Sequence, residues 1–191
     1  MRAISFLLIF SGLIFAFPSV DVRWGDSTSE NINILTAGKA DWIPRCLNSG
    51  MEVRYRFEAQ LCRRRSAWFD SCLGKRVETH RLSFDPITGS YRLVSDRLHD
   101  AVPPEEKTLK SYQEALQETG AVRSMPLAFL AAGHNKYLSA RRAYVNVRVL
   151  VDCKGRYNET LAKISRVITL GLLRPNEYDS GWESFMLKAE K

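Results

Sequence analysis

Residues 63 to 76, with the sequence RRRSAWFDSCLGKR, hold the side chains best suited to binding. Five basic residues surround two aromatic ones: Arg63, Arg64, Arg65, Lys75, Arg76, Trp68 and Phe69. Arginine and lysine pair with phosphate or carboxylate groups, and aromatic rings settle at the depth of lipid headgroups. This pattern predicts contact with an anionic surface. The alternative is that both rings fold back onto the protein and the arginines are only solvated.

Sequence motifs for catalysis are missing. The chain has no Gly-x-Ser-x-Gly, no His-Glu-x-x-His, no P-loop and no Gly-x-Gly-x-x-Gly. Its three histidines, His80, His99 and His134, lack metal-ligand spacing with one another and with the cysteines. His80 falls in an expected strand, where we expect a hydrogen-bonded or solvated role. The sequence therefore predicts no enzyme, no cofactor and no metal. An enzyme would need a polar pocket containing one of these histidines.

Four cysteines, Cys46, Cys62, Cys72 and Cys153, predict two disulfides if the protein is exported. Alternation with the valines of 145–151 places Cys153 on an apolar face. Helical spacing also turns Cys46 toward the core, whereas Cys62 falls on the polar face of its segment. We therefore pair Cys46 with Cys153 and Cys62 with Cys72. The alternative is four free thiols, two of them small core residues.

The first residues predict export. Arg2 precedes an apolar run, Ala3 to Phe17, of a length typical of a secretory signal. We expect cleavage after Ala16, giving a signal peptide at 1–16, with an uncleaved inner-membrane anchor as the alternative. The protein would then lie in the periplasm or elsewhere in the cell envelope. The net charge of +7 would favour anionic lipid or an envelope polymer over nucleic acid, or would only keep the protein soluble.

The spacing of apolar residues predicts the strands and helices that position the candidate binding residues. Apolar and charged residues alternate over 51–65, which predicts a strand with one buried and one wet face. We expect further strands at 76–84 and 91–95, so that residues 63–76 form the loop of the first hairpin in an antiparallel meander. The remaining predicted strands lie within 18–38, 139–153 and at the C-terminal end. We expect a helix at 40–48 that ends at Gly50, a helix at 111–120 that Ser111 caps, and a helix at 158–170. We expect a loop at 97–110.

Strands in adjacent runs with helices between them predict a mainly β (α+β) fold. We expect an antiparallel sheet or sandwich with two or three flanking helices, built as a single domain from residues 17 to 191.

Five segments occur in an order that resembles a family of small proteobacterial exported proteins, domain of unknown function 4390. They are RRRSAWFD, HRLSFDPITGSYRLVS, SYQEALQETG, RAYVNVRVLVD and DSGWESFML, and the resemblance spans roughly residues 20 to 188. The residues that fall on its motifs are Trp68, Phe69, Asp70, Tyr91, Arg92, Trp182 and Phe185. The chain departs from the family in a longer loop between Ser95 and Ser111 and in its four cysteines. The resemblance implies a bacterial envelope location and no particular activity.

These observations predict a non-enzymatic envelope protein with a binding or assembly role. Its basic, aromatic hairpin would contact anionic lipid or an envelope polymer. The alternative is docking onto another periplasmic protein through a sheet edge or the Val-rich strand at 139–153. A minor alternative is an enzyme with an unrecognised site.

Overall fold

The computed structural model describes residues 19–24, 31–37, 40–65, 69–98, 103–131, 143–154 and 177–186. Several expectations fall outside these ranges. They are the N-terminal segment 1–16, the helix at 158–170, and the side chains of Trp68, His99 and His134. Within the described ranges, none of the helices has the length and apolar character that crossing a membrane requires.

Seven strands of the described ranges form a large antiparallel sheet, in the order β10-β8-β3-β4-β5-β6 with β9 also paired to β8. Their bounds are β3 Glu52–Arg63, β4 Ser71–Asp85, β5 Ser90–Leu98, β6 Glu105–Leu109, β8 Ala143–Lys154, β9 Glu177–Asp179 and β10 Glu183–Met186. The predicted meander is present as β3, β4 and β5, which are neighbours in both the chain and the sheet. β8, the Val-rich strand, pairs with β3 over its whole length.

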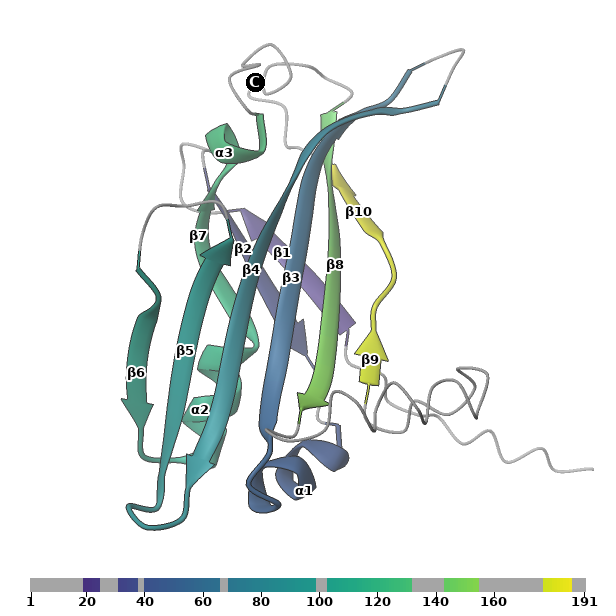
Figure 1. Cartoon of the computed structure of the whole chain (residues 1–191). Helices are drawn as coiled ribbons and strands as arrows, with labels where there is room; N and C mark the ends of the chain where they lie inside the picture. The colour runs from purple at the N-terminus through teal and green to yellow at the C-terminus, as the bar shows by residue number, and fades with distance from the viewer. Residues whose placement is uncertain are drawn as a thin grey trace, which may run out of the picture.

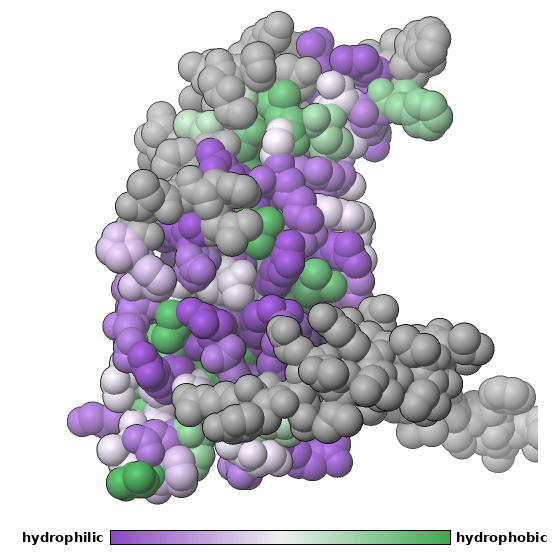
Figure 2. Space-filling model, in the orientation of Figure 1, coloured by the Kyte–Doolittle hydropathy of each residue, from purple (hydrophilic) through white to green (hydrophobic). Residues whose placement is uncertain are grey.

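Three strands form a smaller sheet in the order β1-β2-β7, with bounds Ser19–Trp24, Asn31–Ala37 and Ala121–Pro126. It lies behind the large sheet in Figure 1, so the two sheets are separate layers. Ile34 of the small sheet and Phe57 of the large one are completely buried within the hydrophobic core. The opposite face of the large sheet is mostly hydrophilic (Figure 2). The predicted α+β antiparallel architecture is confirmed.

Three short helices accompany the sheets: α1 Trp42–Asn48, α2 Tyr112–Thr119 and α3 Leu127–Ala131. α2 begins as predicted, because the Ser111 hydroxyl accepts a hydrogen bond from the Glu114 backbone N–H at 3.2 Å. α1 is followed by Gly50, whose φ of 71° is unstrained only for glycine. The start of α2 and the end of α1 therefore fall where local sequence signals place them.

Gly120 joins α2 to β7 at a close approach to β2. Its carbonyl accepts hydrogen bonds from the Thr36 backbone N–H at 2.9 Å and from the Thr36 hydroxyl at 3.0 Å. A Cβ atom at this position would lie 2.5 Å from Thr36 Oγ1 and 3.1 Å from the Leu116 carbonyl oxygen. The absence of a side chain therefore lets the end of α2 pack against the small sheet.

Both predicted disulfides are present. Cys46–Cys153 ties α1 to β8 across a sequence separation of 107, and Cys62–Cys72 joins β3 to β4 across a separation of 10. Cys62 and Cys72 are also register partners in the sheet. One disulfide thus fastens distant parts of the chain, and the other fastens the base of the first hairpin.

The secondary-structure predictions were incomplete: β7 and α3 were not predicted, and two other segments differ from expectation. The expected loop at 97–110 contains the edge strand β6, whose residues 105–108 are all exposed and so give no alternating pattern. The expected strand at 76–84 is longer, because β4 runs from Ser71 to Asp85 and pairs with β3 almost to the hairpin tip.

Candidate functional site

The β3–β4 hairpin extends well beyond the rest of the large sheet (Figure 1). The last register pair before its loop is Arg63 with Ser71, just beyond the Cys62–Cys72 disulfide. The described residues on either side of the loop, 63–65 and 69–71, therefore lie away from the body of the protein, next to a base that is closed by a covalent bond.

The side chains at the end of this hairpin are accessible. Arg63, Arg64 and Arg65 are exposed, and 95% of the Phe69 surface is accessible to solvent. The alternative in which the rings fold back onto the protein is therefore wrong for Phe69. We call Arg63, Arg64, Arg65 and Phe69 the arginine tip.

Asp70 connects the arginine tip to the central sheet. Its carboxylate accepts hydrogen bonds from the Arg65 backbone N–H at 3.2 Å and from the Tyr144 hydroxyl of β8. The Tyr144 hydrogen bond is the main reason that the pKa of Asp70 lies below its ordinary value. Burial, followed by that hydrogen bond, raises the pKa of Tyr144 to about 12. One carboxylate therefore orients the loop and offsets part of its positive charge.

The other two basic residues of the stretch lie farther down β4. Lys75 Nζ is 2.7 Å from Glu58 Oε2, on the outer face of the sheet, and 5.8 Å from the centroid of the Trp182 ring. Arg76 pairs in register with Ala59 and so points to the opposite face from Lys75. The structure therefore groups three of the five predicted cations at the tip and places Lys75 in an ion pair with a buried carboxylate.

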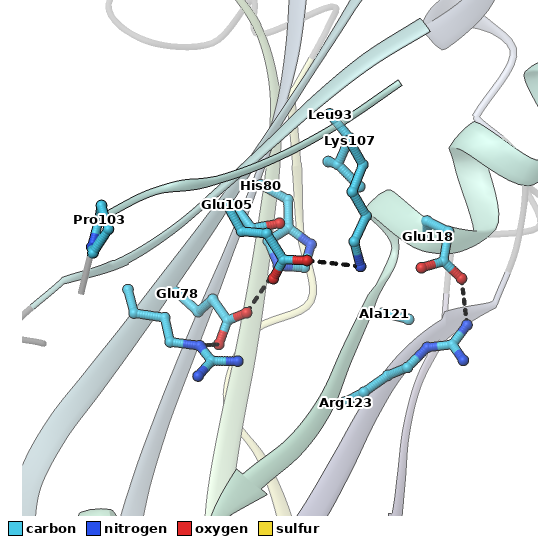
Figure 3. A pocket seen from close by; sticks show the side chains of 11 residues that line it. Glu78, His80, Leu93, Pro103, Glu105, Lys107, Glu118, Ala121 and Arg123 are labelled. Atoms are coloured by element: carbon cyan, nitrogen blue, oxygen red, sulfur yellow. Dashed lines mark hydrogen bonds and ion pairs between the residues drawn. The ribbon is translucent and has the colours of Figure 1, made fainter. Parts of the chain in front are cut away.

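A second site, which we call the polar cleft, lies between the two layers and has a volume of about 210 Å³. The alternation of β4, β5 and β6 brings polar side chains to the inner face of the large sheet: Glu78, His80, Ser95, Arg97, Glu105 and Lys107. Glu118 of α2, with Ala121 and Arg123 of β7, forms the facing wall (Figure 3). The inner face of β4, β5 and β6 is thus lined with charged side chains beyond the edge of the apolar core.

His80 lies at the floor of the polar cleft and is only 4% exposed. Its Nδ1 is 2.9 Å from the Thr119 carbonyl oxygen, and its Nε2 is 2.9 Å from Glu78 Oε1. A carbonyl only accepts, so Nδ1 carries a proton and donates it to the end of α2. The Phe57 ring packs edge-on against the imidazole at a centroid distance of 5.1 Å. Both ring nitrogens are therefore committed to protein groups, and His80 holds α2 against β4.

This cleft meets the one condition that an enzyme was expected to need, a polar pocket that contains a histidine. The position of His80 argues for a structural role, since a general base must reach the substrate proton with a ring nitrogen. Within the described ranges, no group of three or more His, Cys, Asp or Glu side chains is placed to hold a metal ion.

The polar cleft was not predicted from the sequence, although one signal was present. Glu78 and His80 fall on the same face of β4 as Leu82, where alternation alone predicts apolar residues. The facing wall could not be found in this way, because two elements separate β4 from Glu118 in α2 and three separate it from Arg123 in β7. Only the packing of the small sheet brings them to the cleft.

Comparison with known proteins identifies a family without a described activity. No curated protein and no solved structure matches the chain. A family model matches residues 43–155, the segment that contains the arginine tip, the residues that line the polar cleft and all four cysteines. As the resemblance predicted, this chain belongs to the family described as Domain of unknown function (DUF4390).

Proposed function

We propose that this protein is a non-enzymatic component of the bacterial envelope that binds an anionic lipid surface through the arginine tip. The observation that carries the proposal is the exposure of Phe69, at 95%, beside three exposed arginines at the end of a projecting hairpin. Exposure of an aromatic side chain to water is unfavourable, and burial of the ring against an apolar partner lowers the free energy.

The expected strength of this contact is modest. Each arginine near an anionic bilayer contributes about 1 kcal/mol, and burial of the phenyl ring contributes about 2 kcal/mol. Asp70 opposes the arginines, so the tip as a whole supplies about 4 kcal/mol, which corresponds to a Kd of about 1 mM. The contact is therefore reversible, and salt weakens it because exposed charges are screened.

Export to the periplasm or another part of the envelope rests on two supports. Disulfides persist in oxidising compartments, and this protein has two. The sequence of residues 1–16 has the pattern of a secretory signal. In such a compartment, anionic phospholipid headgroups are accessible to an exposed cationic tip.

Vesicle binding tests the proposal. We would compare sedimentation with phosphatidylglycerol vesicles and with phosphatidylcholine vesicles at low salt. The wild type is expected to sediment only with the anionic vesicles. A variant with Arg63→Gln, Arg64→Gln and Arg65→Gln is expected to stay in the supernatant.

A matched control variant distinguishes the effect of the tip's position from the effect of the protein's net charge. Arg23, Arg45 and Arg92 are exposed arginines elsewhere on the protein, and their replacement by Gln removes the same charge. This control variant is expected to sediment like the wild type. Equal losses in both triple variants, or wild-type binding by the tip variant, would overturn the proposal.

Docking of a protein partner through β8 has little support. Its valines Val145, Val147 and Val149 are fully buried, and β3, β9 and β10 already pair with the strand. Recovery of one stoichiometric protein partner without any dependence on lipid would favour docking elsewhere.

A further inference from the structure

The two walls of the polar cleft each contain ion pairs of their own. Lys107 Nζ is 3.1 Å from Glu105 Oε1 on the sheet wall, and Arg123 Nη2 contacts Glu118 Oε1 on the facing wall. In the described part of the chain, no ion pair joins one wall to the other. The walls are instead connected at the floor, through the hydrogen bond from His80 to Thr119.

The members of these pairs differ in accessibility. Arg123 and Glu105 are 68% and 64% exposed, whereas Glu118 is 28% exposed and Glu78 only 9%. The most accessible cation of these pairs and the most accessible carboxylate therefore lie on opposite walls of the polar cleft (Figure 3). A ligand entering from solvent therefore meets the most exposed cation on one side and the most exposed carboxylate on the other, with Arg97 and Lys107, each 50% exposed, beside that carboxylate.

This arrangement favours one chemical class of ligand. Exposed ion pairs contribute little to stability, so a ligand that replaces one partner of each pair costs the protein little. The lining carries three carboxylates and three cations, Glu78, Glu105, Glu118, Arg97, Lys107 and Arg123, so no excess of one sign favours a simple anion or a simple cation. A molecule that carries both charges satisfies both walls.

We propose that the polar cleft binds a small zwitterion, of the class of an amino acid or short peptide, with its carboxylate on Arg123 and its ammonium group on Glu105. A guanidinium group suits a carboxylate because its fork of N–H donors matches the two oxygens. The volume of about 210 Å³ lies below the range of about 300–1,000 Å³ that drug-sized ligands occupy, which limits the ligand to this size.

Calorimetric titration with L-alanyl-L-alanine tests the assignment. The free dipeptide is expected to bind saturably. Its N-acetylated form and its C-terminal amide should each bind about tenfold more weakly, which is the effect of one lost charged contact. Binding of all three compounds with equal affinity, or of none at millimolar concentration, would overturn the proposal.

Charge-neutral variants locate the site. Glu105→Gln and Arg123→Gln are each expected to weaken dipeptide binding about tenfold, and Glu105→Gln should remove the preference for a free amino group over the acetylated form. The controls are Glu106→Gln and Arg92→Gln, which break a neighbouring ion pair on the outer face of β5 and β6. An equal loss in these controls would show that binding does not depend on the cleft. Thermal unfolding of each variant excludes loss of the fold as the cause.

Discussion

The arginine tip and the polar cleft use charge in opposite ways. No ion pair involves the side chains of Arg63, Arg64 or Arg65 among the residues that the structure describes, so their charge is available to a partner. In the cleft, Arg97, Lys107 and Arg123 each contact a carboxylate. An excess of positive charge attracts an extended anionic surface. Ion pairs instead favour a small molecule that carries both charges and can replace one member of each pair.

The two regions also differ in how they are held. The tip depends on one local disulfide and on the contact between Asp70 and Tyr144. The cleft depends on the packing of two layers, with His80 joining β4 to α2. Variants that damage one support should therefore impair one kind of binding and leave the other intact.

The largest expected effect comes from the disulfides. In the chain-entropy model, replacing Cys46 and Cys153 by Ala lowers the free energy of unfolding by about 5 kcal/mol, because that crosslink closes the longer loop. Replacing Cys62 and Cys72 lowers it by about 3 kcal/mol. Urea denaturation of the two double variants measures the difference.

The smaller disulfide also tests the separation between the two regions. The Cys62→Ala, Cys72→Ala variant should lose affinity for anionic vesicles while its dipeptide affinity stays unchanged. A parallel loss of both activities would mean that the tip and the cleft are not supported independently.

An intermediate effect is expected at the floor of the cleft. His80→Ala leaves the Thr119 carbonyl and the Glu78 carboxylate without their buried partner, which costs about 3 kcal/mol of stability. Thr79→Ala, whose side chain lies on the outer face, is the control and should cost less than about 1 kcal/mol. Chemical denaturation gives both values. Equal stability of the two variants would contradict the role of His80 as the link between β4 and α2.

The smallest effect is expected at Tyr144. Tyr144→Phe removes one hydrogen bond to Asp70 and should cost about 1 kcal/mol at neutral pH. The pKa of Tyr144 is raised to about 12, so its contribution is complete below the ordinary tyrosine value near 10 and is lost as pH rises through 12.

The stability difference between wild type and Tyr144→Phe should therefore shrink as pH rises from about 10 to 12. Thermal unfolding across this range measures the difference directly and cancels the titration of lysines common to both proteins. A difference that stays constant with pH would show that the Tyr144 hydroxyl is not bonded to the Asp70 carboxylate.

The parts of the molecule that were predictable from sequence are those set by local patterns. Alternation over 51–65 predicted β3, and the Ser111 and Gly50 signals predicted a helix start and a helix end. Helical spacing placed Cys46 toward the core, where it is buried. Alternation placed Cys62 on the polar face of its strand, but its side chain is fully buried. The arginine tip could be recognised because its residues all lie within 63–69 of the chain.

The polar cleft was not predictable in the same way, because its residues come from β4, β5, β6, α2 and β7. β6 was not predicted because Glu105, Glu106 and Lys107 are all exposed and so show no alternation of apolar and polar residues. β6 lies at a sheet edge, where charged side chains discourage pairing with other strands. Long-range packing therefore determines both the position of β6 and the cleft that β6 helps to form.

The two disulfides are nested in the chain, because the crosslink at 62 and 72 lies inside the one at 46 and 153. The covalent structure is thus a small ring within a large one, and both sites lie within the large ring. A protease that cut the exposed backbone among the tip arginines would open the small ring without dividing the molecule. The nicked protein would remain one covalent unit until its disulfides were reduced, so cleavage at the arginine tip does not release a fragment.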